Sequence, residues 1–159
     1  MLSIFATAAS VMTIYALCSC DYIMIDLPSV QSFTGEIIPA FSGSAGLSPT
    51  CSPATPYMGG TKYSAAFALA LTSAVLGTLA TLLLLIKVGM MGESRVPVLS
   101  GISFSFIFSA FFLGFTLTVL GRWECDEGSC SLGIGALVAI GAVALWLVCA
   151  LIGFVSPLK

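Results

Sequence analysis

Four long apolar runs, separated by polar segments, dominate the pattern of the chain. The clearest of them contains no charged residue and no proline between Ser64 and Ile86. An α-helix rises about 1.5 Å per residue, so about 20 apolar residues cross a hydrocarbon core of roughly 30 Å. The runs lack the period-two alternation of barrel strands, so they predict helices. We expect transmembrane helices at approximately 2–20, 64–88, 98–121 and 131–155.

Residues 1–20 permit two interpretations. An apolar run that ends in small residues is typical of a signal peptide, but no basic residue precedes this run. The alternative is a first transmembrane helix, in which small residues recur at helical spacing. We expect the helix, with a small-residue stripe formed by Ala6, Ala9, Thr13 and Ala16.

The composition favours a membrane protein. The chain is 58% hydrophobic and 8% charged, whereas soluble domains carry about 25% charged residues. We therefore expect an all-α membrane protein, a four-transmembrane-helix bundle that forms a single domain over residues 1–159. The sequence has no basic patch, which argues against a nucleic-acid partner. It also has no histidine, the commonest metal ligand, and we expect no metal site.

Two polar segments, 21–63 and 122–130, are expected to be a long and a short outer loop. The long loop is rich in proline and glycine, which excludes a long helix. Within it, Asp21–Leu27 is rich in β-forming residues and predicts a short strand, with Ser32–Ile38 as its candidate partner. From Ser42 to Thr61 we expect irregular structure.

The few charges predict an orientation. Four spans place both termini on one side, and the loops on that side have a net charge of +2, against −4 on the other side. The positive-inside rule then places the termini in the cytosol, stroma or matrix, and the two loops on the outer or lumenal side. The sequence does not identify the membrane. Aromatic residues at the outer ends of the spans are expected to form an interfacial belt: Tyr22, Tyr63 and Trp123.

The cysteines favour structural disulfides, because all but Cys149 fall on the expected outer side, where oxidation is normal. The candidates are Cys18, Cys20, Cys51, Cys125 and Cys130. Cys125 and Cys130 bracket a short loop, Cys51 has Cys18 or Cys20 as partner, and one outer cysteine stays unpaired. Cysteine pairs on one face are also similar to the layout of four-helix membrane thiol–disulfide oxidoreductases, whose reactive pair is C-x-x-C where this chain has C-x-C.

Small residues repeat at helical spacing in the last three spans. Such faces let helix backbones approach closely, which drives helix association in lipid. They hold one bundle together or recruit a neighbouring protein, and the sequence leaves both open. The expected packing positions are Ala66, Ala70, Ala74, Gly77, Gly101, Ser105, Gly114, Gly135 and Ala139.

The interior of the predicted spans contains no Asp, Glu, Lys or Arg, although proton relays and ion pathways normally need such groups. We also find no pairing of a nucleophile with a base and no phosphate-binding loop. We therefore expect no enzyme, no soluble small-molecule substrate and no cofactor. Bound lipid is expected, and the phenylalanines of the third span leave pigment contact open.

The four spans, the long first loop with its candidate strand and the short second loop resemble the claudin/PMP22-like tetraspan proteins. The resemblance covers the architecture of the whole chain. It implies termini inside, a first outer loop with β-strands and a disulfide, and a structural or adhesive role. The first loop contains no tryptophan, so the tryptophan-containing signature of that family is absent and no functional residue is carried over.

We therefore expect a non-enzymatic membrane protein with a structural role, whose partners are lipid, other membrane proteins or copies of itself. It would assemble laterally or across a gap, through its outer loops and small-residue helix faces. Two alternatives stay open. One is a small accessory subunit of a large photosynthetic or respiratory membrane complex, and the other is the thiol–disulfide oxidoreductase.

Overall fold

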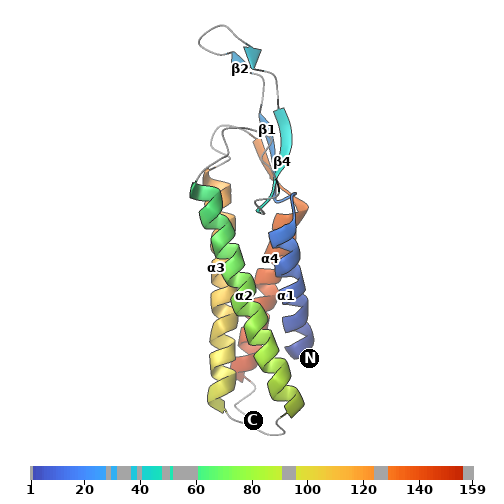
Figure 1. The fold of residues 1–159 in the computed structure, drawn as a ribbon, viewed down its shortest axis with the longest axis vertical. Coiled ribbons are helices and arrows are strands. Elements are labelled where there is room, and N and C mark those ends of the chain that lie inside the picture. The colour runs from blue at the N-terminus through green and yellow to red at the C-terminus, as the bar shows by residue number, and fades with distance from the viewer. Residues whose placement is uncertain are drawn as a thin grey trace.

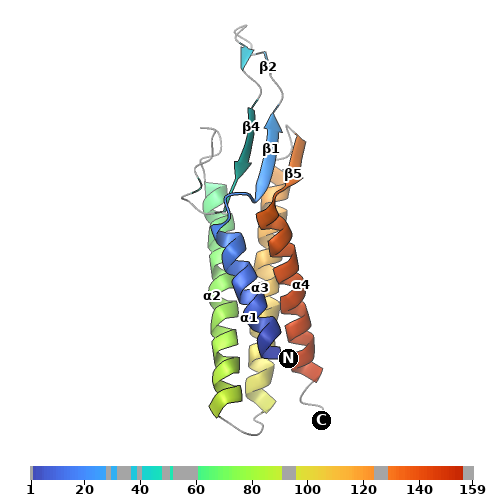
Figure 2. The same cartoon turned by 90° about the vertical axis from the view of Figure 1, so that its right-hand side faces the viewer.

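The computed structural model describes residues 2–27, 30–31, 37–38, 41–47, 51, 61–90, 96–123 and 129–155. Over these residues the chain forms four helices: α1 (Leu2–Cys18), α2 (Thr61–Met90), α3 (Val96–Trp123) and α4 (Ile134–Val155). The helices form an elongated bundle with strands standing on one end (Figure 1). The first turn of α1 and the last turn of α4 both lie toward the opposite end (Figure 2).

Three of the described helices are long and apolar enough to cross a membrane. The candidate spans are Ser64–Lys87, Ser100–Thr118 and Ile134–Val155. The first helix, α1, is apolar throughout but has 17 residues, so its length of about 26 Å falls slightly short of a typical hydrocarbon core. The structure therefore forms helices at three of the predicted spans, α2, α3 and α4, that have the length and composition needed to cross a membrane.

The bundle has a ring order in which α1 packs against α2 and α4, and α3 packs against the same two helices. Its interior is built largely from small side chains, which allow close approach of the backbones. The large apolar side chains point outward instead, as in Leu83, Phe111 and Leu151, each more than half exposed. Small residues inside and large apolar residues outside are the reverse of a soluble core, and this arrangement suits a bundle that is surrounded by lipid.

Trp146 of α4, the largest buried side chain among the described residues, fills the middle of the bundle. Its ring stacks on Phe106 of α3 with centroids 5.1 Å apart, and it lies against the backbone of α2 at Gly77. The indole nitrogen Nε1 donates a hydrogen bond of 3.1 Å to Thr13 Oγ1 of α1. One tryptophan therefore contacts all three other helices.

Hydroxyl groups form further links between helices. Ser10 of α1 and Thr81 of α2 share a hydrogen bond of 3.1 Å between their hydroxyl oxygens. Ser73 of α2 donates to the backbone carbonyl of Ser109 of α3 at 2.8 Å, and Ser109 donates back to the carbonyl of Ser73 at 3.2 Å. All four side chains are buried, so these bonds satisfy groups that lipid could not.

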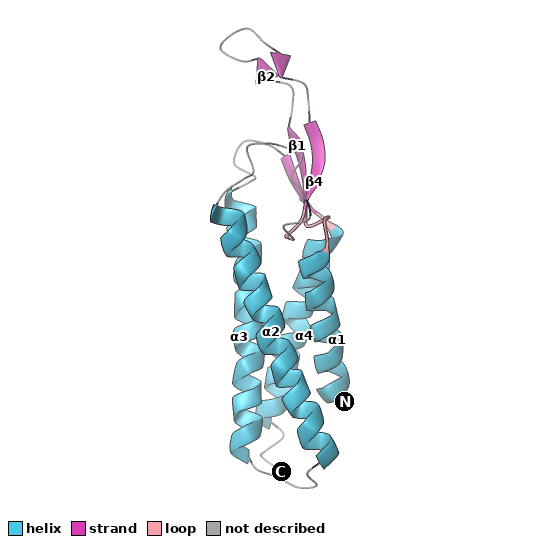
Figure 3. Ribbon diagram, in the orientation of Figure 1, coloured by secondary structure: helices cyan, strands magenta, loops and turns pink. Residues whose placement is uncertain are grey.

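Five short strands occur in the described outer part of the chain, drawn in magenta in Figure 3. A three-stranded antiparallel sheet has the order β4 (Phe41–Ala45), β1 (Ile23–Leu27), β5 (Ser129–Leu132). A second, smaller ladder pairs β2 (Val30–Gln31) with β3 (Ile37–Ile38). Because β5 comes from the second loop, the central strand β1 joins the two outer loops into one unit.

The strand pairing differs from the sequence-based expectation. The strand at Ile23–Leu27 was correctly expected, but it pairs with β4 and β5, whereas Ile37–Ile38 pairs with β2. The prediction of irregular structure was wrong for Ser42–Ala45, which lies in β4. Glycine and serine are weak strand formers, so the sequence FSGSA gives little sign of a strand that β1 stabilises as a partner.

The small residues of the helices divide into two sets. Ala66, Ala70 and Ala139 are fully buried, and Ala74 is nearly so. On α3 the structure differs from the predicted packing, because a Cβ built on Gly101 or Gly114 would meet no described atom outside its own helix backbone within 4 Å. Ser105, one turn after Gly101, donates to its own helix at the carbonyl of Gly101, at 3.2 Å.

A matched pair of glycine substitutions tests this division. Gly77→Ala places a methyl group into the Trp146 ring, and we expect a loss of about 1–3 kcal/mol of stability, as for overpacked cores. Gly114→Ala adds the same methyl group in open space and should leave stability unchanged or raise it by less than about 1 kcal/mol. Thermal unfolding in one detergent gives the comparison, and equal shifts for the two variants would contradict the packing described here.

Candidate functional site at the junction of helices and sheet

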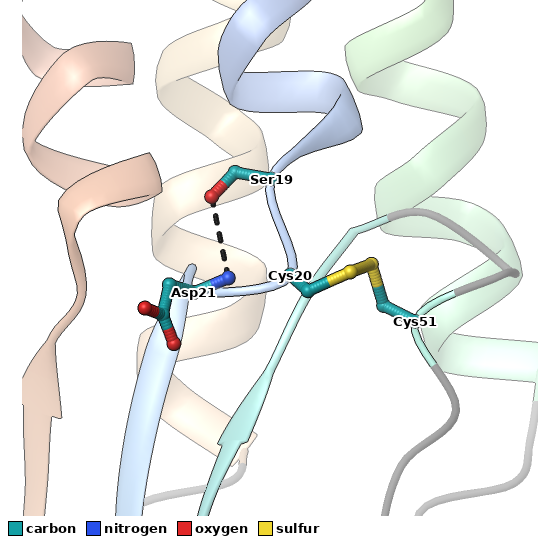
Figure 4. Close-up of a disulfide and its surroundings, with 4 residues drawn as sticks. All are labelled: Ser19, Cys20, Asp21 and Cys51. Carbon is teal, nitrogen blue, oxygen red and sulfur yellow. Dashed lines mark hydrogen bonds between the residues drawn. A yellow bond between two sulfur atoms is a disulfide. The ribbon is translucent and has the colours of Figure 1, made fainter.

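The segment Ser19–Tyr22 connects α1 to β1 and is the point where the sheet joins the helices. It leaves α1 directly after Cys18, and Ser19 Oγ accepts a hydrogen bond of 3.2 Å from the backbone nitrogen of Asp21 (Figure 4). This bond stabilises a tight turn between a helix axis and a strand. The turn sets the direction in which the sheet leaves the bundle.

Chain from the first outer loop contacts one side of this segment. A Cβ built on Gly46 would lie 2.5 Å from both Cys20 Cα and the Ser19 carbonyl oxygen, and 2.8 Å from Cys51 Sγ. Only glycine allows so close an approach of two backbones. Beside this contact, Cys20 and Cys51 form a disulfide with a Cα–Cα distance of 5.2 Å (Figure 4).

The start of α4 contacts the segment as well. The backbone nitrogen of Gly133 donates to the Tyr22 carbonyl at 3.0 Å, and that of Gly135 donates to the Asp21 carbonyl at 2.8 Å. The first amides of a helix have no partner within the helix, so these carbonyls cap α4. A Cβ at Gly133 would collide with the Asp21 carbonyl, and one at Gly135 would lie 2.8 Å from Ser19 Oγ. We call the contacts of Ser19–Tyr22 with Gly46, Cys51 and the start of α4 the junction clamp.

Tyr22 lies inside the protein rather than at a lipid interface. Its side chain is 1% exposed and packs with alanines of three helices: Ala16, Ala66, Ala70, Ala136 and Ala139. The structure therefore does not expose it as a belt residue. Its hydroxyl group is buried without a hydrogen-bond partner in the described part of the chain, and this burial raises the pKa of Tyr22 well above its ordinary value of 10.0.

The other belt candidates lie in helices, Tyr63 in α2 and Trp123 at the last residue of α3. Their side chains lie outside the described part of the structure.

The cysteines fall into three groups: those in a disulfide, those that are free thiols, and those whose side chains the structure does not describe. Cys51 pairs with Cys20 rather than Cys18, and Cys18 is an exposed free thiol at the end of α1. Cys125 lies outside the described residues, and Cys130 lies in β5 with its side chain outside them. Since Cys20 is bonded to Cys51, the C-x-C pair is not a disulfide in this structure. Over the described residues no three metal-ligating side chains come together.

A cleft of about 380 Å³ opens beside the segment, between the end of α1 and the start of α4. Its lining is apolar at Tyr15 and Ile134, and polar at the junction: Cys18, Ser19, Cys20 and Asp21. Figure 4 shows the Asp21 carboxylate on the side of the chain opposite the disulfide. Among the described residues the carboxylate has no ion pair. Small-residue repeats can be recognised in the sequence, but this cleft cannot. It forms where residues that are distant along the chain, at the end of α1 and the start of α4, come together.

The disulfide of the junction clamp should stabilise the fold measurably. It joins residues 31 positions apart, and closing a loop of that length in the unfolded chain corresponds to about 3–4 kcal/mol. We expect the double variant Cys20→Ser/Cys51→Ser to lose stability of that order. Cys18→Ser, the matched control, removes an unpaired thiol and should change little in non-reducing thermal unfolding. A double variant as stable as the control would contradict a supporting role for this disulfide.

The Tyr22 hydroxyl gives a second prediction. Tyr22→Phe removes a buried polar group without a partner and should leave stability unchanged or raise it by about 1 kcal/mol, whereas Tyr22→Leu opens a cavity and should lower it by more than about 1 kcal/mol. The folded protein holds the phenol proton more tightly than the unfolded chain. The stability that the protonated Tyr22 contributes to the folded state is therefore complete below pH 10 and is lost as the pH rises above that value.

The loss of folding stability at alkaline pH should be smaller in Tyr22→Phe than in the wild-type protein. Chemical unfolding between pH 8 and pH 11 measures this difference. The same slope in both proteins would show that Tyr22 titrates equally in the folded and unfolded chains.

No protein-family model matches the chain, and no curated protein shows significant similarity to it. The function is therefore argued from the junction, the sheet and the helix surfaces.

Proposed function

We propose that this chain is a membrane-embedded structural protein that assembles with copies of itself through its rigid outer sheet. In this proposal α1 crosses the membrane as well, which gives four spans in all. Both termini of the chain then face the cytosol, stroma or matrix, and the sheet faces the outer or lumenal side. The junction clamp is the observation that carries the proposal. A sheet held by a disulfide and by backbone contacts keeps a fixed orientation relative to the membrane, as assembly requires.

The exposed parts of the sheet support contact with another molecule. Met24, at the centre of one face, pairs in register with Ser44 of β4 and Ser131 of β5. All three side chains are exposed. Within the described residues β4 and β5 each pair only with β1, so the sheet presents an edge on each side. Edge strands offer free backbone donors and acceptors to a neighbouring strand.

The open side of α3 supports lateral contact within the membrane. A Cβ built on Gly101 or Gly114 would meet no described atom outside its own helix, and exposed phenylalanines lie between these two positions around the helix, at Phe104, Phe108 and Phe115. Small residues beside large ones form a surface against which a second helix can pack closely. The same surface suits the alternative role as an accessory subunit, in which a different membrane protein would cover α3.

Cysteine cross-linking in native membranes tests assembly through the sheet. In a Cys18→Ser background, Ser44→Cys places a thiol on the exposed face of the sheet. Ser64→Cys places the same group at an exposed position near the sheet end of α2. We expect oxidation to give a cross-linked dimer of this chain with Ser44→Cys, several-fold more abundant than with Ser64→Cys.

Mass spectrometry of the cross-linked bands distinguishes the alternatives. Bands that contain only this chain support self-assembly. Bands that join it to several different subunits would replace the proposal with the accessory role. Equal cross-linking at both positions would contradict assembly through the sheet.

A further inference from the structure

We propose that the cleft between α1 and α4 binds the ammonium head group of a zwitterionic phospholipid, with the lipid tails lying along the two helices. The inference goes beyond the assembly proposed above and shares with it only the placement of the helices in a membrane. It rests on the charge of the cleft, on an aromatic ring at its wall and on the apolar surface below it.

The charge of the cleft selects a cation. Asp21 is the charged residue among the described residues that line it, and no described side chain forms an ion pair with its carboxylate. The backbone amide of Asp21 is hydrogen-bonded to Ser19 and its carbonyl to the amide of Gly135, which fixes the position of the residue. A carboxylate held in this way at the edge of a low-dielectric region attracts a positive group strongly.

The wall of the cleft suits an ammonium group in particular. Tyr15 lines it with a side chain that is 52% exposed. The face of an aromatic ring attracts ammonium and quaternary ammonium groups. A carboxylate and an aromatic face together favour choline or ethanolamine over a metal ion, which would need several oxygen ligands. The volume of about 380 Å³ also lies within the usual range for ligand sites.

The surface below the cleft indicates that the ammonium group belongs to a lipid. One turn from Tyr15, away from the sheet, Val11 of α1 is 61% exposed, and one turn from Ile134 the side chain of Leu137 of α4 is 57% exposed. These side chains continue the cleft toward the middle of the bundle as an apolar strip. A free amine in solution would use the cleft alone, whereas a phospholipid would cover both parts.

The lining also predicts which lipids bind. Its described residues include no lysine or arginine to hold a phosphate group, so the phosphate stays at the open mouth and recognition falls on the ammonium group. Phosphatidylcholine and phosphatidylethanolamine should bind, and phosphatidylglycerol, which lacks the ammonium group, should bind weakly.

The test uses the purified full-length chain in detergent after removal of bound lipid. Dioleoylphosphatidylcholine, dioleoylphosphatidylglycerol and choline chloride are each titrated, while native mass spectrometry counts bound lipid and thermal unfolding follows stabilisation by the ligand. We expect phosphatidylcholine to bind roughly tenfold more tightly than phosphatidylglycerol, the difference typical of one charge-assisted contact.

Four variants assign the binding to the cleft. Asp21→Asn keeps the backbone contacts and should lose the preference for phosphatidylcholine, whereas Asp26→Asn, the same change further along the chain in β1, should keep it. Tyr15→Phe should bind as the wild-type protein does, and Tyr15→Leu should bind about two- to fivefold more weakly.

Two results would overturn the proposal. If choline chloride at millimolar concentration protects as well as the lipid does, the cleft takes a free amine and the lipid is not its ligand. If Asp21→Asn and Asp26→Asn show the same lipid preference, the cleft does not recognise the head group. Neither result bears on cross-linking through the sheet, so the two proposals fail separately.

Discussion

The architecture depends on one close contact between backbones, at the segment Ser19–Tyr22. Gly46 approaches it from the first outer loop, and Gly133 approaches it from the start of α4. Backbone contacts of this kind leave no room for a side chain to adjust, so they define an orientation more strictly than side-chain packing does. The disulfide between Cys20 and Cys51 adds a covalent limit at the same place. Sheet and bundle are therefore one mechanical unit.

Inside the bundle the balance of forces differs from that in a soluble core. Lipid supplies little hydrophobic drive for helix association, so close packing and hydrogen bonds must do more. Trp146 provides the packing by lying against Gly77 and stacking on Phe106. Buried hydroxyls such as Ser73 and Ser109 provide the hydrogen bonds between helices. Close packing and buried hydrogen bonds together account for a stable bundle whose interior is built largely from small residues such as alanine.

The helices were predictable from the sequence because their signal is local. A long uncharged apolar run requires backbone hydrogen bonds within the segment, so the runs around Ala70 and Ala139 identified α2 and α4. Packing was predictable only in part. Gly77 and Gly114 look alike in sequence, yet one faces a tryptophan and the other faces open space. Tyr22 seemed interfacial because it follows a span, but the turn at Ser19 directs it inward. Such differences come from contacts between distant residues, which local patterns do not record.

The position of β5 has a consequence for biosynthesis. The central strand β1 is made early, directly after α1, whereas β5 precedes the last helix, α4. During translation β1 can pair with β4 early, but its other edge stays unpaired until the segment that contains β5 has been made. The same late segment supplies the amides that meet the carbonyls of Asp21 and Tyr22. Completion of the sheet therefore requires that α3 and the segment after it have been made, and a chain that ended before β5 would leave one edge of β1 unpaired.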